Sequence, residues 1–344
     1  MKIGIVGASG YGGLELIRLL HQHPEVEQID LFTSSEEGSM FSAKFPHTLT
    51  LYDRALKGIN EDSLSSCNVV FASTPAGVTS ELLPPLISEE RRLIDLSGDF
   101  RLKDPAVYKH WYKKEPAPIE VIEQATYGLT EWNRDAIRQA RLLANPGCYP
   151  TAVLLSLLPL IKERLIDPTQ LVIDAKSGVS GAGNTPSQMT HFSETNENLS
   201  IYKIHAHQHI PEIEQAIEQF ANASIAVTFT THLVPMTRGI MTTSYAPVYE
   251  GITEEDLLNC LQETYQSSPF VRVMQDATKF CTKQVYGSNF CDIHVKLDRR
   301  TNRATIISVI DNVVKGAAGQ AIQNMNIQME LDETTGLTHV PLFI

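Results

Sequence analysis

The amino-acid sequence predicts an α/β protein. We expect a doubly wound parallel sheet in the first half and an α+β domain with a mixed, largely antiparallel sheet in the second. In the first half, short apolar runs alternate with helical stretches, and a glycine-rich turn follows the first run. Such alternation is typical of parallel strands covered by helices. After Cys148 the apolar runs are longer and partly alternate with polar residues, which indicates a sheet packed on one face.

Composition sets limits on the class of protein. A chain of 344 residues with 42% hydrophobic and 20% charged residues suggests two globular domains. The net charge of −12, without a Lys/Arg block, argues against nucleic acid or an anionic membrane as partner. No apolar run is long enough to span a membrane, and a first strand at Lys2 leaves no room for a signal peptide. The five cysteines lack C-x-x-C spacing and indicate free thiols, so we expect a cytoplasmic protein.

The first half begins with a strand, a glycine turn and a helix. The run from Lys2 precedes "GASGYGG", and Leu14, Ile17 and Leu20 then repeat at helical spacing. Further strands are expected at 29–32, 69–72, 93–96 and 142–144. Segment 108–120 is polar and broken by two prolines, which predicts a linker or a mobile surface piece.

The glycine turn indicates a Rossmann-type dinucleotide site. Glycines between a strand and a helix allow a tight turn and let a phosphate approach the helix N-terminus. The alternative is a purely structural turn. The residues expected to bind the cofactor here are Gly7, Ser9, Gly10, Tyr11, Gly12 and Gly13.

The end of the second strand bears on cofactor choice. The NAD fingerprint expects Asp or Glu at this point to bind the ribose 2′-OH, but Thr33, Ser34 and Ser35 stand here. Hydroxyls do not repel a 2′-phosphate, which favours NADP, whereas Glu36 and Glu37 favour the opposite preference.

The second half is expected to contain strands at 225–233, 241–249, 292–297 and 304–310. The C-terminal segment returns to helical period, with Val313, Ala317, Ala321 and Met325 on one stripe that could pack on the first domain. We therefore expect a dinucleotide-binding domain at 1–147, completed by a helix at 313–330, and a catalytic domain at 148–312.

One cysteine has a setting that favours reactivity. Cys148 follows Pro-Gly and precedes an apolar run, with Pro150 suited to a first helical turn. The N–H groups and dipole of a helix N-terminus stabilise a thiolate. The alternative is an inert core cysteine beside an apolar helix.

A histidine cluster could serve this thiol. His205, His207 and His209 alternate before Pro211, where a helix is expected to start, so on an extended segment they could share one face. One or two of them could act as a base for Cys148 near neutral pH. A zinc site is the competing interpretation, but there is no nearby Cys pair or H-E-x-x-H helix, and we expect no metal.

Two further segments could bind anions. Arg101 follows an apolar strand and could clamp a carboxylate or phosphate, or it could form a salt bridge with Asp99. The loop at 176–184, rich in glycine and serine, could wrap an anion or be a simple turn.

Motifs along nearly the whole chain carry a family resemblance. They are "GASGYGG", "DLSGDFRL", "YGLTE", "NPGCYPT", "DAKSGVSGAG", "HQHIPEI", "HLVPMTRGI" and "DNVVKGAAGQAIQNMN". The sequence resembles the N-acetyl-γ-glutamyl-phosphate reductases of the semialdehyde dehydrogenase superfamily. The resemblance implies reduction of N-acetyl-L-glutamyl 5-phosphate by NADPH through a cysteine thioester, with release of inorganic phosphate, in arginine biosynthesis. It also implies a homodimer or homotetramer.

The resemblance assigns roles to individual residues. It implies Cys148 as nucleophile and His209 as acid/base. The implied substrate contacts are Arg101, His207, Ser177 and Gly178, and the further cofactor contacts are Ser180, Gly181 and Asn312.

The chain departs from the family pattern at three positions. Glu36 and Asn184 stand where the family usually carries Arg, and Ala76 stands where it usually carries His. The alternatives are an aspartate-semialdehyde dehydrogenase acting on another acyl phosphate, a dinucleotide sensor without the chemistry, and a zinc hydrolase.

Overall fold

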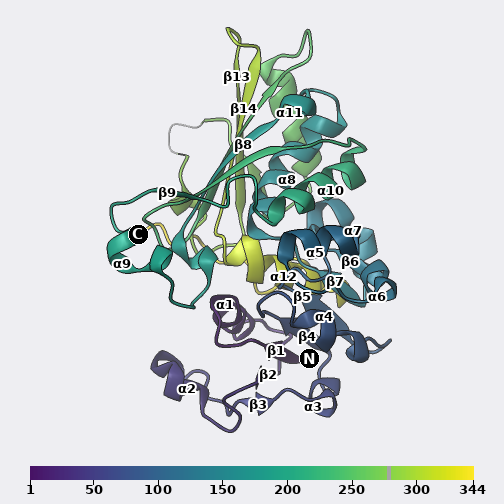
Figure 1. Cartoon of the computed structure of the whole chain (residues 1–344), viewed down its shortest axis with the longest axis vertical. Helices are drawn as coiled ribbons and strands as arrows, with labels where there is room; N and C mark the ends of the chain where they lie inside the picture. Colours follow the sequence, from purple (N-terminus) through teal and green to yellow (C-terminus); the bar gives the residue numbers. More distant parts are fainter. Residues whose placement is uncertain (277–279) are drawn as a thin grey trace. The chain divides into compact units, whose positions relative to one another are not determined.

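The chain forms two compact units. The structure, a computed structural model, describes residues 1–276 and 280–344 (Figure 1). Unit 1 comprises Met1–Pro146 and Ala317–Thr338, and unit 2 comprises Gly147–Gly316 and His339–Ile344. Within the described ranges, no helix has both the length and the apolar character needed to cross a membrane.

Unit 1 is built on a seven-stranded sheet in which every neighbouring pair is parallel. The strands follow the order β3-β2-β1-β4-β5-β7-β6. Their bounds are β1 Lys2–Val6, β2 Gln28–Thr33, β3 Lys57–Gly58, β4 Val69–Ala72, β5 Arg92–Asp95, β6 Ala125–Tyr127 and β7 Leu142–Ala144. The predicted doubly wound parallel sheet is confirmed. The order reverses between β1 and β4, which is where such sheets bind ligands.

Helices and short turns connect these strands. The helices are α1 Tyr11–Leu20, α2 Phe41–Lys44, α3 Glu61–Ser65, α4 Thr79–Leu82, α5 Pro105–Tyr112, α6 Ile119–Gln124, α7 Thr130–Gln139 and α12 Gly319–Gln328. Val6, Phe32, Val70 and Leu93 are buried in one hydrophobic cluster contributed by four neighbouring strands. Strands with buried residues on both faces are typical of a parallel sheet between helical layers.

The C-terminal segment does not begin as the regular helix expected from residue 313. Val314–Ala318 form a π-helical turn, in which the N–H of Gly316 donates to the carbonyl of Asp311 at 3.0 Å. The helix becomes α-helical only from Gly319. Within unit 1, α12 packs against α7 and α1, and the side chain of Asn324 bonds both the hydroxyl of Thr130 and the carbonyl of Gly128.

Unit 2 contains a mixed, largely antiparallel sheet, as predicted. Its described strands follow the order β12-β13-β14-β11-β8-β10-β9, with parallel pairing only at β12/β13 and β8/β10. Their bounds are β8 Val172–Ser177, β9 Ser200–Tyr202, β10 Thr228–Leu233, β11 Ile240–Pro247, β12 Val271–Val273, β13 Cys291–Asp298 and β14 Arg303–Ile310. Along β8 and β10, buried and more exposed residues alternate, because one face of the sheet carries the core.

Helices gather on one side of this sheet (Figure 1). They are α8 Cys148–Lys162, α10 His209–Ala221 and α11 Glu254–Tyr265, while the short α9 is Phe192–Thr195. Helix α8 is buried all round, since it packs against β11 and β14 as well as α10 and α11. Pro159 within α8 cannot bond the carbonyl of Leu155, and the hydroxyl of Tyr265 donates to that carbonyl at 2.5 Å instead.

Segment 108–120 is not the linker or mobile piece that its composition predicted. Pro105 occupies the first turn of α5, where its missing N–H costs nothing, and Asp104 caps that helix by accepting from the N–H of Ala106. Tyr108 is fully buried, and its hydroxyl donates to Oδ1 of Asp99 at 2.7 Å. The two prolines of the segment separate α5 from α6 and do not disorder the chain.

We expect Tyr108→Phe to lower the free energy of unfolding by about 2 kcal/mol, because a buried carboxylate loses a hydrogen bond. Urea unfolding followed by circular dichroism measures the change, with Tyr249→Phe as a control at an exposed tyrosine. Equal stability of the two variants would contradict the structural role given to the Tyr108 hydroxyl.

Candidate active site

The glycine turn between β1 and α1 is packed as closely as a backbone allows. Gly7 has φ +81°, and Gly10 is the N-cap of α1. A Cβ on Gly13 would overlap the carbonyl of Gly7, and a Cβ on Gly12 would overlap the Ser73 hydroxyl. No acidic residue lies in the first turn of α1, so its N-terminus can receive a phosphate without repulsion. The turn therefore fits the pyrophosphate of a dinucleotide. Ser9 belongs to the same turn, and Tyr11 opens the helix with an exposed side chain.

The hydroxyl residues that follow β2 form a bend at its carboxyl end. The N–H of Ser35 donates to the Thr33 hydroxyl at 3.3 Å, while Ser34 and Ser35 are exposed. Glu36 accepts from Nζ of Lys44 through both carboxylate oxygens, at 3.0 and 2.9 Å. The acidic residue that disfavoured NADP in the sequence is therefore neutralised by a lysine.

Arg101 is fixed by backbone carbonyls of unit 1. Its Nε donates to the carbonyl of Asn145 at 2.7 Å and its Nη2 to that of Leu96 at 3.0 Å, and the residue is 6% exposed. These bonds belong to neither the anion clamp nor the salt bridge expected from the sequence. Asp99 instead accepts from the N–H groups of Gly77 and Ser80, among other donors. Burial and the neighbouring Asp99 raise the pKa of Asp95.

Cys148 is the first residue of α8, and Gly147 is its N-cap. Pro150 lies in the same turn, and no acidic residue of α8 itself is placed there. The first N–H groups of a helix have no acceptor within the helix, so they and the helix dipole favour a thiolate at this position. Gly316 lies directly against the cysteine: a Cβ added to it would come within 2.8 Å of the Cβ of Cys148.

His209 is the first residue of α10, so the expected helix start at Pro211 was two residues late. A Cβ on Gly147 would overlap Nε2 of His209, which puts this imidazole against the backbone next to Cys148. His207 and His209 lie with ring centroids 4.7 Å apart. The backbone N–H of His209 donates to Nδ1 of His207 at 3.2 Å. The neutral His207 therefore carries its proton on Nε2.

The extended histidine face expected from the sequence is wrong. Lys203 and His205 have left-handed φ values of 48° and 51°, so the segment turns and leaves His205 exposed while His207 and His209 are buried. In the described part of the chain, no group of three or more His, Cys, Asp or Glu residues is arranged to hold a metal ion.

Glu212 was not identified from the sequence. It is fully buried on the first turn of α10, and its Oε1 accepts from the N–H of Gly147 at 2.8 Å. This bond ties the start of α10 to the start of α8. The spacing of three residues between His209 and Glu212 places both on one helix face and could have revealed it.

Two tyrosines border the histidines. Tyr149 is buried, its ring meets those of His207 and His209 edge-on, and its hydroxyl lies 2.9 Å from that of Tyr202. Burial, with the proximity of Cys148, raises the pKa of Tyr202 to about 12. Both phenols are therefore protonated at neutral pH.

The glycine- and serine-rich loop is held by Asn312. Ser177 ends β8, and a short 3₁₀ turn, η4 Val179–Ala182, follows Gly178. The side chain of Asn312 donates to the Ser180 hydroxyl at 2.9 Å and accepts from the N–H of Gly239 at 2.7 Å. A Cβ on Gly181 would come within 2.9 Å of the Ser177 hydroxyl, which also interacts with the Tyr149 phenol. Unit 2 thus brings its predicted loop residues close to the residue that follows Cys148.

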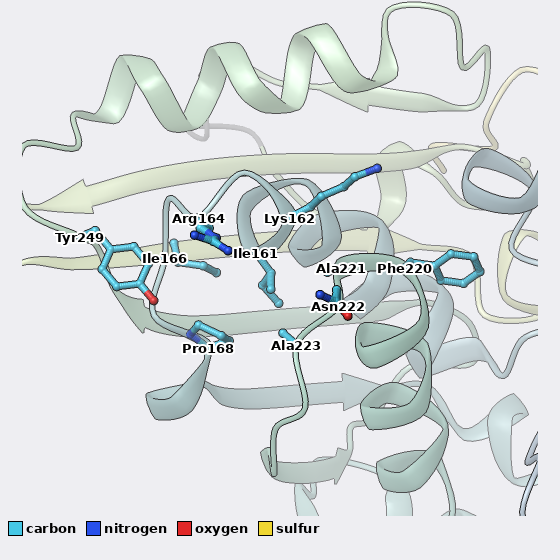
Figure 2. Close-up of a pocket in the computed structure, with 10 residues that line it drawn as sticks. All are labelled: Ile161, Lys162, Arg164, Ile166, Pro168, Phe220, Ala221, Asn222, Ala223 and Tyr249. Carbon is cyan, nitrogen blue, oxygen red and sulfur yellow. The ribbon is translucent and has the colours of Figure 1, made fainter.

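A cavity of about 720 Å³ lies elsewhere in unit 2 (Figure 2). Arg164 and Asn222, which follow the C-terminal ends of α8 and α10, line it together with Tyr249. Helix α8 has 15 residues, so this cavity is about 20 Å along the helix from Cys148. It is therefore separate from the cysteine and histidine site.

A dinucleotide-binding sheet, joined in one chain to a unit that presents a cysteine and a histidine at helix N-termini, defines an NAD(P)-dependent oxidoreductase. Residues 2–140 match the model of the semialdehyde dehydrogenase NAD binding domain, and residues 148–312 match that of the semialdehyde dehydrogenase dimerisation domain. The chain belongs to the semialdehyde dehydrogenase family.

Relatives that match over the full length of the chain carry the name of one enzyme. An N-acetyl-gamma-glutamyl-phosphate reductase from Geobacillus kaustophilus is 52% identical, over 100% of both chains. The reductase of the same name from Bacillus subtilis is also 52% identical over the full length of both. The family resemblance predicted from the motifs is confirmed.

Solved structures share the fold at much lower identity. Aspartate semialdehyde dehydrogenase II from Vibrio cholerae has a TM-score of 0.72 and 18% identity, over 96% of this chain and 98% of that one. Aspartate semialdehyde dehydrogenase with NADP from Candida albicans has a TM-score of 0.73 and 16% identity, over 95% and 98%.

The buried His207 predicts a pH dependence of stability. Burial, then the charge of Lys203, lowers its pKa from 6.5 to about 3. Between these values the unfolded chain binds a proton that the folded protein does not, so His207 destabilises the protein as the pH falls from about 6.5. Between pH 6.5 and 5, we expect the free energy of unfolding to fall by about 1.5 kcal/mol more in the wild type than in His207→Gln. Urea unfolding at both pH values measures this, and parallel losses would contradict the neutral buried state.

Proposed function

We propose that the protein catalyses the NADPH-dependent reductive dephosphorylation of N-acetyl-L-glutamyl 5-phosphate to N-acetyl-L-glutamate 5-semialdehyde, a step of arginine biosynthesis. The observation that carries this proposal is the meeting of two helix N-termini, with Cys148 first on α8 and His209 first on α10. The full-length relatives named N-acetyl-gamma-glutamyl-phosphate reductase support the choice of substrate.

Cys148 is the proposed nucleophile. Its thiolate attacks the acyl carbon, the bond from that carbon to the phosphate oxygen breaks, and inorganic phosphate leaves. The product is a thioester on Cys148, whose carbonyl carbon accepts hydride. When bound at the glycine turn, NADPH would supply that hydride. N–H groups at the start of α8 stabilise the oxyanion that forms, and one such donor contributes about 3 kcal/mol.

His209 is the proposed acid/base. Its imidazole donates a proton to the oxyanion of the thiohemiacetal and takes it back as the C–S bond breaks, releasing the aldehyde and the thiolate. His207 cannot share this task at neutral pH, because its pKa is lowered to about 3 and it holds no second proton. We propose that His207 instead holds the start of α10 by accepting from the backbone N–H of His209, and that it contacts the substrate.

The remaining site residues are assigned to binding. Arg101, Ser177 and Gly178 are proposed to contact the substrate. The proposed cofactor contacts are the glycine turn with Ser9 and Tyr11, the hydroxyls of Thr33, Ser34 and Ser35, and Ser180, Gly181 and Asn312. The close packing of the glycine turn, with Gly7 at φ +81°, supports its part in this assignment.

We also propose a homodimer or homotetramer in the cytoplasm. The match of residues 148–312 to a dimerisation domain supports self-association. None of the five cysteines forms a disulfide, which suits a reducing compartment.

Phosphate-dependent oxidation of N-acetyl-glutamate semialdehyde, run with NADP and with NAD, tests the proposal. Aspartate semialdehyde is the competing substrate in the same assay, because the solved structures of similar fold are aspartate semialdehyde dehydrogenases. A greater kcat/KM for aspartate semialdehyde than for N-acetyl-glutamate semialdehyde would show that the proposed substrate is wrong. Turnover of neither aldehyde would favour a dinucleotide sensor without the chemistry.

We expect Cys148→Ser to abolish reduction and leave the dissociation constant of NADPH unchanged, because a serine hydroxyl is not ionised at this helix N-terminus. Turnover and nucleotide fluorescence measure the two effects. Cys260→Ser, at a cysteine whose pKa burial raises to about 11, is the matched control and should keep full activity. Near-normal turnover of Cys148→Ser would exclude the covalent mechanism.

We expect His209→Asn to lower kcat by about 10²- to 10⁴-fold, the usual contribution of a general acid–base. The limb of the pH–rate profile that reports the histidine should disappear in this variant. If the profile keeps the shape of wild type, another group transfers the proton.

A further inference from the structure

We propose that Lys44 is the residue that selects NADPH over NADH in this chain, by exchanging Glu36 for the 2′-phosphate of the cofactor. The inference rests on the proposed function, which takes NADPH as the reductant. It concerns a residue that lies outside the turn where a cation is normally sought.

The chain lacks a cation where dinucleotide folds usually place one. In such folds the adenosine ribose binds near the end of the second strand, where a carboxylate bonds the 2′-OH of NAD or an arginine accommodates the 2′-phosphate of NADP. Here β2 ends at Thr33, and the residues from Ser34 to Ser39 include two glutamates and no Lys or Arg. The sequence of the turn alone therefore favours NAD.

The structure brings a lysine back to this turn from α2. Lys44 is the last residue of α2, and its Nζ lies 3.0 and 2.9 Å from the two carboxylate oxygens of Glu36. An ammonium group thus lies within hydrogen-bond distance of a residue three positions beyond the end of β2. It cancels the charge that would repel a 2′-phosphate.

The Lys44–Glu36 pair can exchange partners. The two side chains are 43% and 39% exposed, and ion pairs of that exposure contribute little to stability. A phosphate monoester carries close to two negative charges and three acceptor oxygens, so it attracts an ammonium group more strongly than one carboxylate does.

Two other charged groups of this region, Lys57 and Glu37, have contacts elsewhere, and one cation competes with Lys44. Lys57 is paired with Asp30 at 2.8 Å, and Asp30 is buried. The carboxylate of Glu37 lies over Gly58 of β3, where an added Cβ would overlap it. Arg54 is exposed, and its carbonyl accepts from the N–H of Phe41 on α2, so it is the competing cation.

Dissociation constants of NADPH and NADH for the full-length protein, measured by nucleotide fluorescence without substrate, test the inference. We expect Lys44→Ala to raise the dissociation constant of NADPH about tenfold and to change that of NADH by less than about twofold. This is the effect expected for the loss of one charge-assisted contact. Glu36→Gln removes the competing carboxylate and should lower the dissociation constant of NADPH. Lys109→Ala, at an exposed lysine paired with Glu115 at 2.8 Å, is the matched control and should change neither constant.

The outcomes separate this inference from the proposed function. Unchanged NADPH binding in Lys44→Ala overturns the inference and leaves the proposed function standing. The same holds if NADPH binding weakens tenfold in Arg54→Ala and not in Lys44→Ala. Equal weakening of both nucleotides in Lys44→Ala also overturns it, because the role of Lys44 would then be structural. A wild-type protein that binds neither nucleotide contradicts the proposed function itself.

Discussion

The hydrogen bond from the N–H of Gly147 to Glu212 holds together the two helix ends on which the site depends. Helix N-termini carry partial positive charge, so two of them side by side repel each other. The buried carboxylate of Glu212 offsets that repulsion, and its helix also carries His209. Since Gly147 has no Cβ, the imidazole can lie against the backbone immediately before Cys148. The backbone at the two helix N-termini therefore places Cys148, the proposed nucleophile, near His209, the proposed base.

Buried carboxylates organise unit 1 in a similar way. Asp95 ends β5 and accepts from the N–H groups of the loop that follows, at Ser97 and Gly98. Asp99, on that loop, accepts from N–H groups at the start of α4 and from Tyr108 of α5. Each carboxylate replaces the missing partners of several backbone donors, which a buried loop must satisfy. The loop carrying Arg101 is therefore tied by these bonds to the end of β5, to α4 and to α5.

The sequence predicted those features that depend on local pattern. Strands such as Val69–Ala72 and Leu142–Ala144 are short apolar runs between polar breaks, and the glycine turn and Cys148 are recognised from neighbours in the chain. Segment 108–120 was misread because prolines open and separate helices as readily as they break them. The left-handed backbone of His205 and the π turn over Val314–Ala318 could not be predicted, because neither has a signature in the local pattern of apolar and polar residues. Glu212 acts on a residue 65 positions away, so only the fold could identify its partner.

Burial keeps one of the two paired histidines neutral. The rings of His207 and His209 lie against each other, and the backbone N–H of His209 donates to Nδ1 of His207. Burial, then the charge of Lys203, lowers the pKa of His207 to about 3, so its ring is neutral near neutral pH. A second positive charge beside His209 would oppose its protonation, and a permanently neutral His207 avoids that cost. The neutral ring of His207 thus accepts from the backbone at the start of α10, and the proposed proton transfer falls to His209.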